Sequence, residues 1–131
     1  EPFQDVRVRK AVQMAIDRQA ILDALYGGRG QTEHGIFPHG LIGFQEDQTQ
    51  IAYDPEGAKA LLAEAGYGDG FTMELAADSS ASDTMTMSLE IIKEQLAAVG
   101  IQAEIRNYDE STWLETRKAG DHPKAKGRNP V

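Results

Sequence analysis

The stretch from residue 71 to residue 106 constrains the fold most, because its apolar residues change their period twice. Phe71, Met73 and Leu75 alternate with polar residues, which is typical of a β-strand with one buried face. Apolar side chains then recur at steps of three and four, as on one stripe of a helix: Met85, Leu89, Ile92, Leu96 and Val99. A second alternating run follows, of Ile101, Ala103 and Ile105. A strand, a helix and a strand in this order predict two parallel strands joined by a right-handed crossover.

We therefore predict an α/β lobe with a parallel β-α-β core whose strands cover about residues 71–76 and 101–106. Helical patterns precede and follow this core, and each begins after a residue suited to cap a helix N-terminus: Asp5, Asp17, Asp54, and either Asp109 or Ser111. Residues 29–52 contain scattered glycines and a proline but no sustained apolar period, which predicts a long loop.

Composition limits the classes of function. With 131 residues, 40% of them hydrophobic and 26% charged, the chain suits one globular domain. A net charge of −8 argues against a nucleic-acid partner, whose phosphates need a basic surface. No apolar run approaches the roughly 18–20 residues of a membrane span. The chain has no cysteine, so a disulfide framework and thiolate metal sites are excluded.

The chain begins Glu1-Pro2-Phe3, without the basic and apolar segments of a secretion signal. A mature or excised product would lack them too, so this observation leaves the compartment open.

Four segments carry a family resemblance. Residues 5–21 contain DVRVRKAV followed by AIDR and an isoleucine, and residues 53–67 contain YDP followed by AKALLAEAGY. Gly70-Phe71 opens the first strand, and residues 92–101 read IKEQLAAVGI. In this order, these segments resemble the bacterial extracellular solute-binding proteins of the peptide/nickel type, family 5, which are receptor subunits of ABC importers.

The resemblance runs from about Pro2 to Asp121 and implies only part of a receptor. Proteins of the family have several hundred residues and close a solute between two lobes, so residues 1–121 look like a fragment of the C-terminal lobe. The family continues with another strand and an aromatic, Asp-containing segment. Here residues 122–131 are basic and without period, so we predict a flexible tail.

What the resemblance implies is a receptor without catalysis of its own and without a cofactor, which delivers peptides, nickel chelates or similar small solutes to ABC permease subunits. It also implies a periplasmic or extracellular location, with membrane association of the full-length protein. We further expect that an exposed surface of the lobe allows a homodimer.

The candidate ligand-binding residues are Asp78, Ser79, Ser80, Tyr108 and Trp113. In open α/β sheets, ligands bind beyond the carboxyl ends of the strands, and the first four of these residues follow or end the two predicted strands. Main-chain N–H groups at the following helix start and short hydroxyls suit carboxylates or peptide carbonyls, while Tyr108 suits an apolar side chain.

Each of these features has a simpler interpretation. The polar run from Asp78 to Ser82 could simply cap the following helix. Trp113 could simply anchor the last helix by being partly buried. His34 and His39, five residues apart, are either a metal pair or solvated loop residues, and we assign no metal site.

The sequence does not support an enzymatic function, because Ser79, Ser80 and Ser82 do not lie in a Gly-x-Ser-x-Gly motif. The alternative to a receptor is a free-standing small α/β interaction or sensory domain. Bare sheet edges would favour a piece of a larger receptor, since an independent domain protects its edges.

Overall fold

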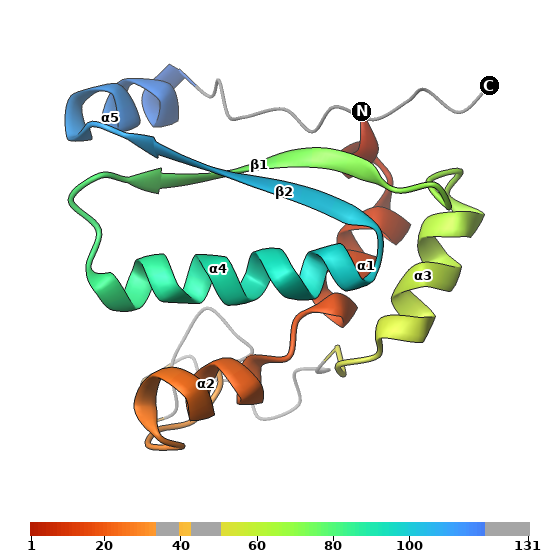
Figure 1. Ribbon diagram of the computed structural model, residues 1–131, viewed down its shortest axis with the longest axis horizontal. Coiled ribbons are helices and arrows are strands. Elements are labelled where there is room, and N and C mark those ends of the chain that lie inside the picture. The colour runs from red at the N-terminus through yellow and green to blue at the C-terminus, as the bar shows by residue number, and fades with distance from the viewer. Residues whose placement is uncertain (34–39, 43–50, 120–131) are drawn as a thin grey trace.

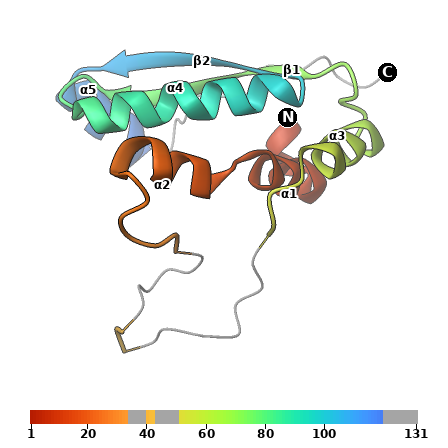
Figure 2. The same cartoon turned by 60° about the horizontal axis from the view of Figure 1, so that its bottom comes forward.

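The computed structural model of the chain describes residues 1–33, 40–42 and 51–119. Its elements are η1 (Pro2–Gln4), α1 (Val6–Ala15), α2 (Arg18–Tyr26), α3 (Pro55–Glu64), β1 (Phe71–Asp78), α4 (Asp83–Ala98), β2 (Ile101–Tyr108) and α5 (Glu110–Ala119). Helix α4 runs along the two strands, with α1 and α3 near their amino ends and α5 at their carboxyl ends (Figure 1). Helix α2 lies against the other side of α4 (Figure 2). The predicted tail, most of the predicted loop, His34 and His39 lie outside the described residues.

Strands β1 and β2 confirm the predicted parallel β-α-β core. They pair in register from Phe71 with Ile101 to Asp78 with Tyr108, and α4 connects them. Both strands run past their predicted ends at residues 76 and 106, because strand pairing satisfies main-chain N–H and C=O groups whatever the side chains are. Within the described part of the chain, each strand has one strand neighbour, so each keeps an outer edge that no other strand covers.

The two faces of the sheet differ in polarity. On one face, Phe71, Ile101 and Ala103 are buried in a cluster with Leu96 of α4 and with Val99, the residue that caps the C-terminus of this helix. The opposite face, called the polar face below, carries the alternate residues Thr72, Glu74, Ala76, Asp78, Gln102, Glu104, Arg106 and Tyr108. The chain therefore buries one face of a two-stranded sheet and leaves polar side chains on the other.

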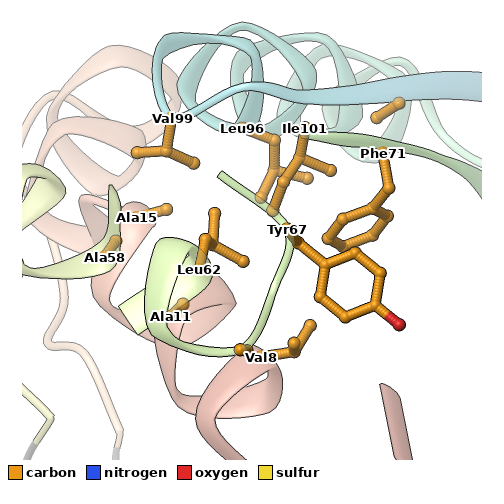
Figure 3. Close-up of a cluster of buried hydrophobic side chains, with 12 residues drawn as sticks. Val8, Ala11, Ala15, Ala58, Leu62, Tyr67, Phe71, Leu96, Val99 and Ile101 are labelled. Atoms are coloured by element: carbon orange, nitrogen blue, oxygen red, sulfur yellow. The ribbon is translucent and has the colours of Figure 1, made fainter. Parts of the chain in front are cut away.

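Helices α1 and α3 complete the core near the amino ends of the strands. Val8, Ala11 and Ala15 of α1 and Ala58 and Leu62 of α3 are each at most 1% exposed (Figure 3). Three of these five side chains are alanine, so the two helices can approach closely. The fully buried leucine and valine fill the remaining space, which anchors this helix pair to the sheet.

Side-chain hydrogen bonds fix the helices relative to one another. The Gln95 amide of α4 accepts from the main-chain N–H of Asp17 at 3.0 Å and donates to its carbonyl at 3.4 Å. These bonds hold the break between α1 and α2 against α4. Arg7 pairs with Asp5 and also donates to the carbonyl of Glu64 at 2.9 Å, which ties α1 to the end of α3.

The predicted helix signals at the N-termini are confirmed. The carboxylates of Asp5, Asp17 and Asp54 accept from main-chain N–H groups in the first turns of α1, α2 and α3. Helix α3 ends in a Schellman motif, in which the Tyr67 N–H bonds the Leu62 carbonyl at 2.7 Å. The prediction that Met85 of α4 points into the core was wrong. Its side chain is 53% exposed, because the sheet and α1 bury only the later turns of this helix.

Gly70 allows the starts of the two strands to lie side by side. Its φ of 77° is left-handed, and a Cβ at this position would lie 1.9 Å from the carbonyl oxygen of Gly100. Gly68 lacks both restrictions, since its φ is not in the left-handed range and a Cβ there would lie 3.5 Å from Ala63.

We expect Gly70→Ala to lower the free energy of unfolding by more than about 2 kcal/mol, because the left-handed backbone alone costs an L-residue roughly 1–2 kcal/mol and the Gly100 carbonyl adds a clash. Gly68→Ala is the matched control and should change it by less than about 1 kcal/mol. Urea unfolding of both variants measures the difference. Equal midpoints for the two variants would contradict this account.

Candidate functional site

The sheet brings four of the five predicted ligand-binding residues together at the carboxyl ends of the strands. Asp78 and Tyr108 are register partners at the last paired position. The main-chain N–H of Ser79 then donates to the Tyr108 carbonyl at 2.7 Å, which extends the pairing by one bond. Ser79 and Ser80 are exposed, while Asp78 and Tyr108 are half-buried. The arrowheads in Figure 1 mark this edge of the sheet.

Asp78 and Ser80 form a turn of their own. The Asp78 Oδ1 atom accepts from both the N–H and the Oγ hydroxyl of Ser80, each at 2.8 Å. The Ala81 N–H donates to the Asp78 carbonyl at 2.9 Å. Because the Ser80 hydroxyl donates its proton to Asp78, it offers solvent or a ligand its lone pairs and accepts from an N–H group.

Ser82 alone among the residues from Asp78 to Ser82 caps α4. Its hydroxyl accepts from the Met85 N–H at 3.3 Å. Capping therefore explains Ser82 but leaves the Asp78–Ser80 turn free for another role at the edge.

Trp113, the fifth predicted residue, lies next to Tyr108. The two ring centroids are 6.5 Å apart and the rings are inclined by 31°. Helix α5 starts directly after β2, with the Asp109 carboxylate accepting from the Thr112 N–H at 3.0 Å. Hydrogen bonds from Ser111 and from Thr112 hold the pKa of Asp109 well below its usual value, which keeps this cap ionised. Trp113 is half-buried, so it also anchors α5.

Sequence reasoning missed Glu74. The Tyr108 hydroxyl donates to its Oε1 atom, and Arg106 Nε lies 3.2 Å from its Oε2 atom. The hydrogen bond to the Glu74 carboxylate, together with partial burial, raises the pKa of the Tyr108 phenol. Alternation in the first predicted strand placed Glu74 outside the core, but Tyr108 follows the predicted end of the second strand. The observed register shows that Glu74, Arg106 and Tyr108 share a face.

A groove between α2 and α4 was also missed. It has a volume of about 240 Å³, and its lining comprises Ile21, Leu25, Tyr26, Ser82, Thr84, Met85 and Ser88. The groove depends on how two helices distant in sequence are placed, so no local pattern predicted it. Its volume lies below the roughly 300–1,000 Å³ of most small-molecule pockets.

Within residues 1–33, 40–42 and 51–119, no helix combines the length and the apolar character needed to cross a membrane. In the same residues, no three His, Asp or Glu side chains gather in a way that would hold a metal ion.

Ser82→Ala should lower the free energy of unfolding by roughly 0.5–2 kcal/mol, because the Met85 N–H loses its capping acceptor. Ser79→Ala is the matched control, since it keeps the main-chain bond to Tyr108 and should have little effect. Thermal unfolding followed by circular dichroism compares them. A larger loss in the Ser79 variant would mean that the cap is assigned to the wrong residue.

Comparison with known proteins gives consistent results in sequence and in structure. The sequence model of the family described as "Bacterial extracellular solute-binding proteins, family 5 Middle" matches residues 1–127. The dipeptide-binding protein of Escherichia coli strain K12 is 36% identical over 125 residues, which cover 93% of this chain and 23% of that protein.

Two solved structures superpose on nearly the whole chain. HbpA2 from Haemophilus parasuis has a TM-score of 0.85 and 30% identity, over 95% of this chain and 25% of its own. The dipeptide-binding protein from Pseudoalteromonas sp. SM9913, in complex with Met-Leu, has a TM-score of 0.82 and 28% identity, over 96% of this chain and 26% of its own. The chain thus spans about a quarter of the length of these relatives. A match that extends over almost every residue, in sequence as in fold, shows that the chain belongs to the bacterial extracellular solute-binding proteins of family 5.

Proposed function

We propose that the chain forms part of the C-terminal lobe of a receptor that binds peptides or comparable small solutes for an ABC importer. The family match over residues 1–127 carries this proposal. The E. coli relative is a dipeptide-binding protein, and the Pseudoalteromonas relative holds Met-Leu, so a peptide is the favoured solute. Nickel chelates remain within the expected range of the family.

The open sheet edges support a part of a lobe over a free-standing interaction domain. Among the described residues, β1 and β2 each pair along one edge only. Exposed strand edges invite pairing with other chains, and independent domains usually protect them. Within a receptor, further strands of the same lobe would cover these edges.

The proposed solute site is the carboxyl edge formed by Asp78, Ser79, Ser80, Tyr108 and Trp113. Ligands of open α/β sheets bind beyond this end of the strands. The Asp78–Ser80 turn offers acceptors for N–H or ammonium groups of a peptide, and the Tyr108–Trp113 pair offers aromatic surface for an apolar side chain. A second lobe would close over this edge, so that solute shifts the population from open to closed receptors.

The receptor role also implies the partners, the location and the oligomeric state of the full-length protein. The chain binds without catalysis, as expected of a family of solute-binding proteins. Its partners are the permease subunits, and its location is periplasmic or extracellular, with membrane association of the full-length receptor. The exposed surface of the lobe is where a homodimer would form.

Replacing both serines of the turn, Ser79→Ala with Ser80→Ala, should weaken binding of Met-Leu to the full-length receptor roughly tenfold, because each lost hydrogen bond contributes about 0.5–1.5 kcal/mol. Isothermal titration calorimetry measures the affinity, and circular dichroism checks that the fold is kept.

Thr72→Ala is the matched control. It removes a hydroxyl from the other end of β1, on the polar face, and should leave the affinity unchanged. An unchanged affinity in the double serine variant would exclude the carboxyl edge as the solute site.

A further inference from the structure

The Glu74 carboxylate is held on the polar face between the Tyr108 phenol and the Arg106 guanidinium. Each of its oxygens has one partner: Oε1 accepts from the Tyr108 hydroxyl, and Oε2 lies 3.2 Å from Arg106 Nε. Its side chain is 16% exposed, against 63% for Arg106. A hydrogen bond at one oxygen and an ion pair at the other fix the orientation of a carboxylate more firmly than one interaction does.

The register shows how far Tyr108 reaches to make this bond. Glu74 pairs with Glu104, whereas Tyr108 pairs with Asp78, four positions further along the strands. At about 3.3 Å per residue, this is roughly 13 Å along the sheet. Both side chains must extend toward each other, so the phenol hydroxyl lies back over the polar face.

With its hydroxyl bound to Glu74, the Tyr108 ring lies next to Trp113, and the two ring centroids are 6.5 Å apart. Trp113 belongs to α5, and the Asp109 carboxylate caps this helix by accepting from the Thr112 N–H in its first turn. A continuous series of contacts therefore runs from the middle of β1, through Glu74 and Tyr108, to the first helix turn beyond β2.

We propose that Glu74 is a positioning residue that holds the Tyr108 ring against Trp113 and so sets the aromatic surface at the solute edge. The effect on solute rests on the proposed function, whereas the effect on the two rings does not. Without Glu74, rotation about the Tyr108 side-chain bonds carries the phenol toward the carboxyl edge, where it competes with solute for the space beside Ser79.

The first experiment uses the 131-residue chain without solute, because Trp113 is its only tryptophan. Glu74→Ala should shift the Trp113 emission to longer wavelength and increase its quenching by acrylamide about twofold, since the half-buried indole loses the covering ring. Tyr108→Phe, which keeps the ring but loses the donor, should have a similar effect. Glu74→Gln keeps an acceptor oxygen and should restore most of the wild-type signal.

Glu104→Ala is the matched control: it removes the register partner of Glu74, an exposed carboxylate on the same face, and should leave Trp113 emission unchanged. Ultraviolet titration gives a second readout. The difference between wild type and Tyr108→Phe isolates this phenol, whose pKa lies above its usual value because of Glu74. In Glu74→Ala the pKa should fall. Unchanged emission together with an unchanged pKa would overturn the positioning role.

The second experiment measures Met-Leu affinity in the full-length receptor by calorimetry. Glu74→Ala should weaken binding about fivefold and should have no further effect once Tyr108→Ala is present. Equal losses with and without the tyrosine would show that Glu74 does not act through Tyr108. If the double serine variant binds normally, the proposed solute site at the carboxyl edge fails, yet the fluorescence of the solute-free chain still decides whether Glu74 positions the rings.

Discussion

The packing of α4 on one face of the two-stranded sheet is the constraint on which the rest of the structure depends. Leu96 of this helix and Val99 at its C-terminal cap are buried with Phe71 and Ile101 of the strands. A crossover helix is what makes two consecutive strands parallel, and parallel strands bring both carboxyl ends to one edge. The closeness of Asp78 and Tyr108 follows from this packing and from the approach of Gly70 to Gly100 at the other end.

Burial of one face leaves the other face for polar interactions, and it separates the residues that stabilise the fold from those proposed to bind solute. The core at the amino ends is apolar and alanine-rich, and the carboxyl end is made of short turns, caps and one aromatic pair. Interactions at the carboxyl end are therefore replaceable without loss of the core. On the polar face, Glu74 connects the middle of β1 with the carboxyl end, because its partner Tyr108 stands at the last paired position.

Much of the fold was predictable from the sequence, because period and capping are local properties. The apolar alternation from Phe71 and the helical stripe ending at Val99 sufficed for the β-α-β core, and Asp5, Asp17 and Asp54 marked helix starts. Strand ends, the exposure of Met85 and the groove beside α2 were missed because they depend on pairing and on helix placement. The contact between Glu74 and Tyr108 was missed because it depends on register and on side-chain reach, which no local pattern encodes.

Hydrogen–deuterium exchange of the full-length receptor, with and without Met-Leu, tests the central claim most directly. A lobe that grips solute at its carboxyl edge predicts slower exchange of the main-chain amides from Ser79 to Thr84 and from Tyr108 to Trp113 when solute is bound. Amides in α3 (Pro55–Glu64), at the opposite end of the sheet, should exchange at the same rate in both states. Slower exchange confined to α3, with none at the carboxyl edge, would contradict the account.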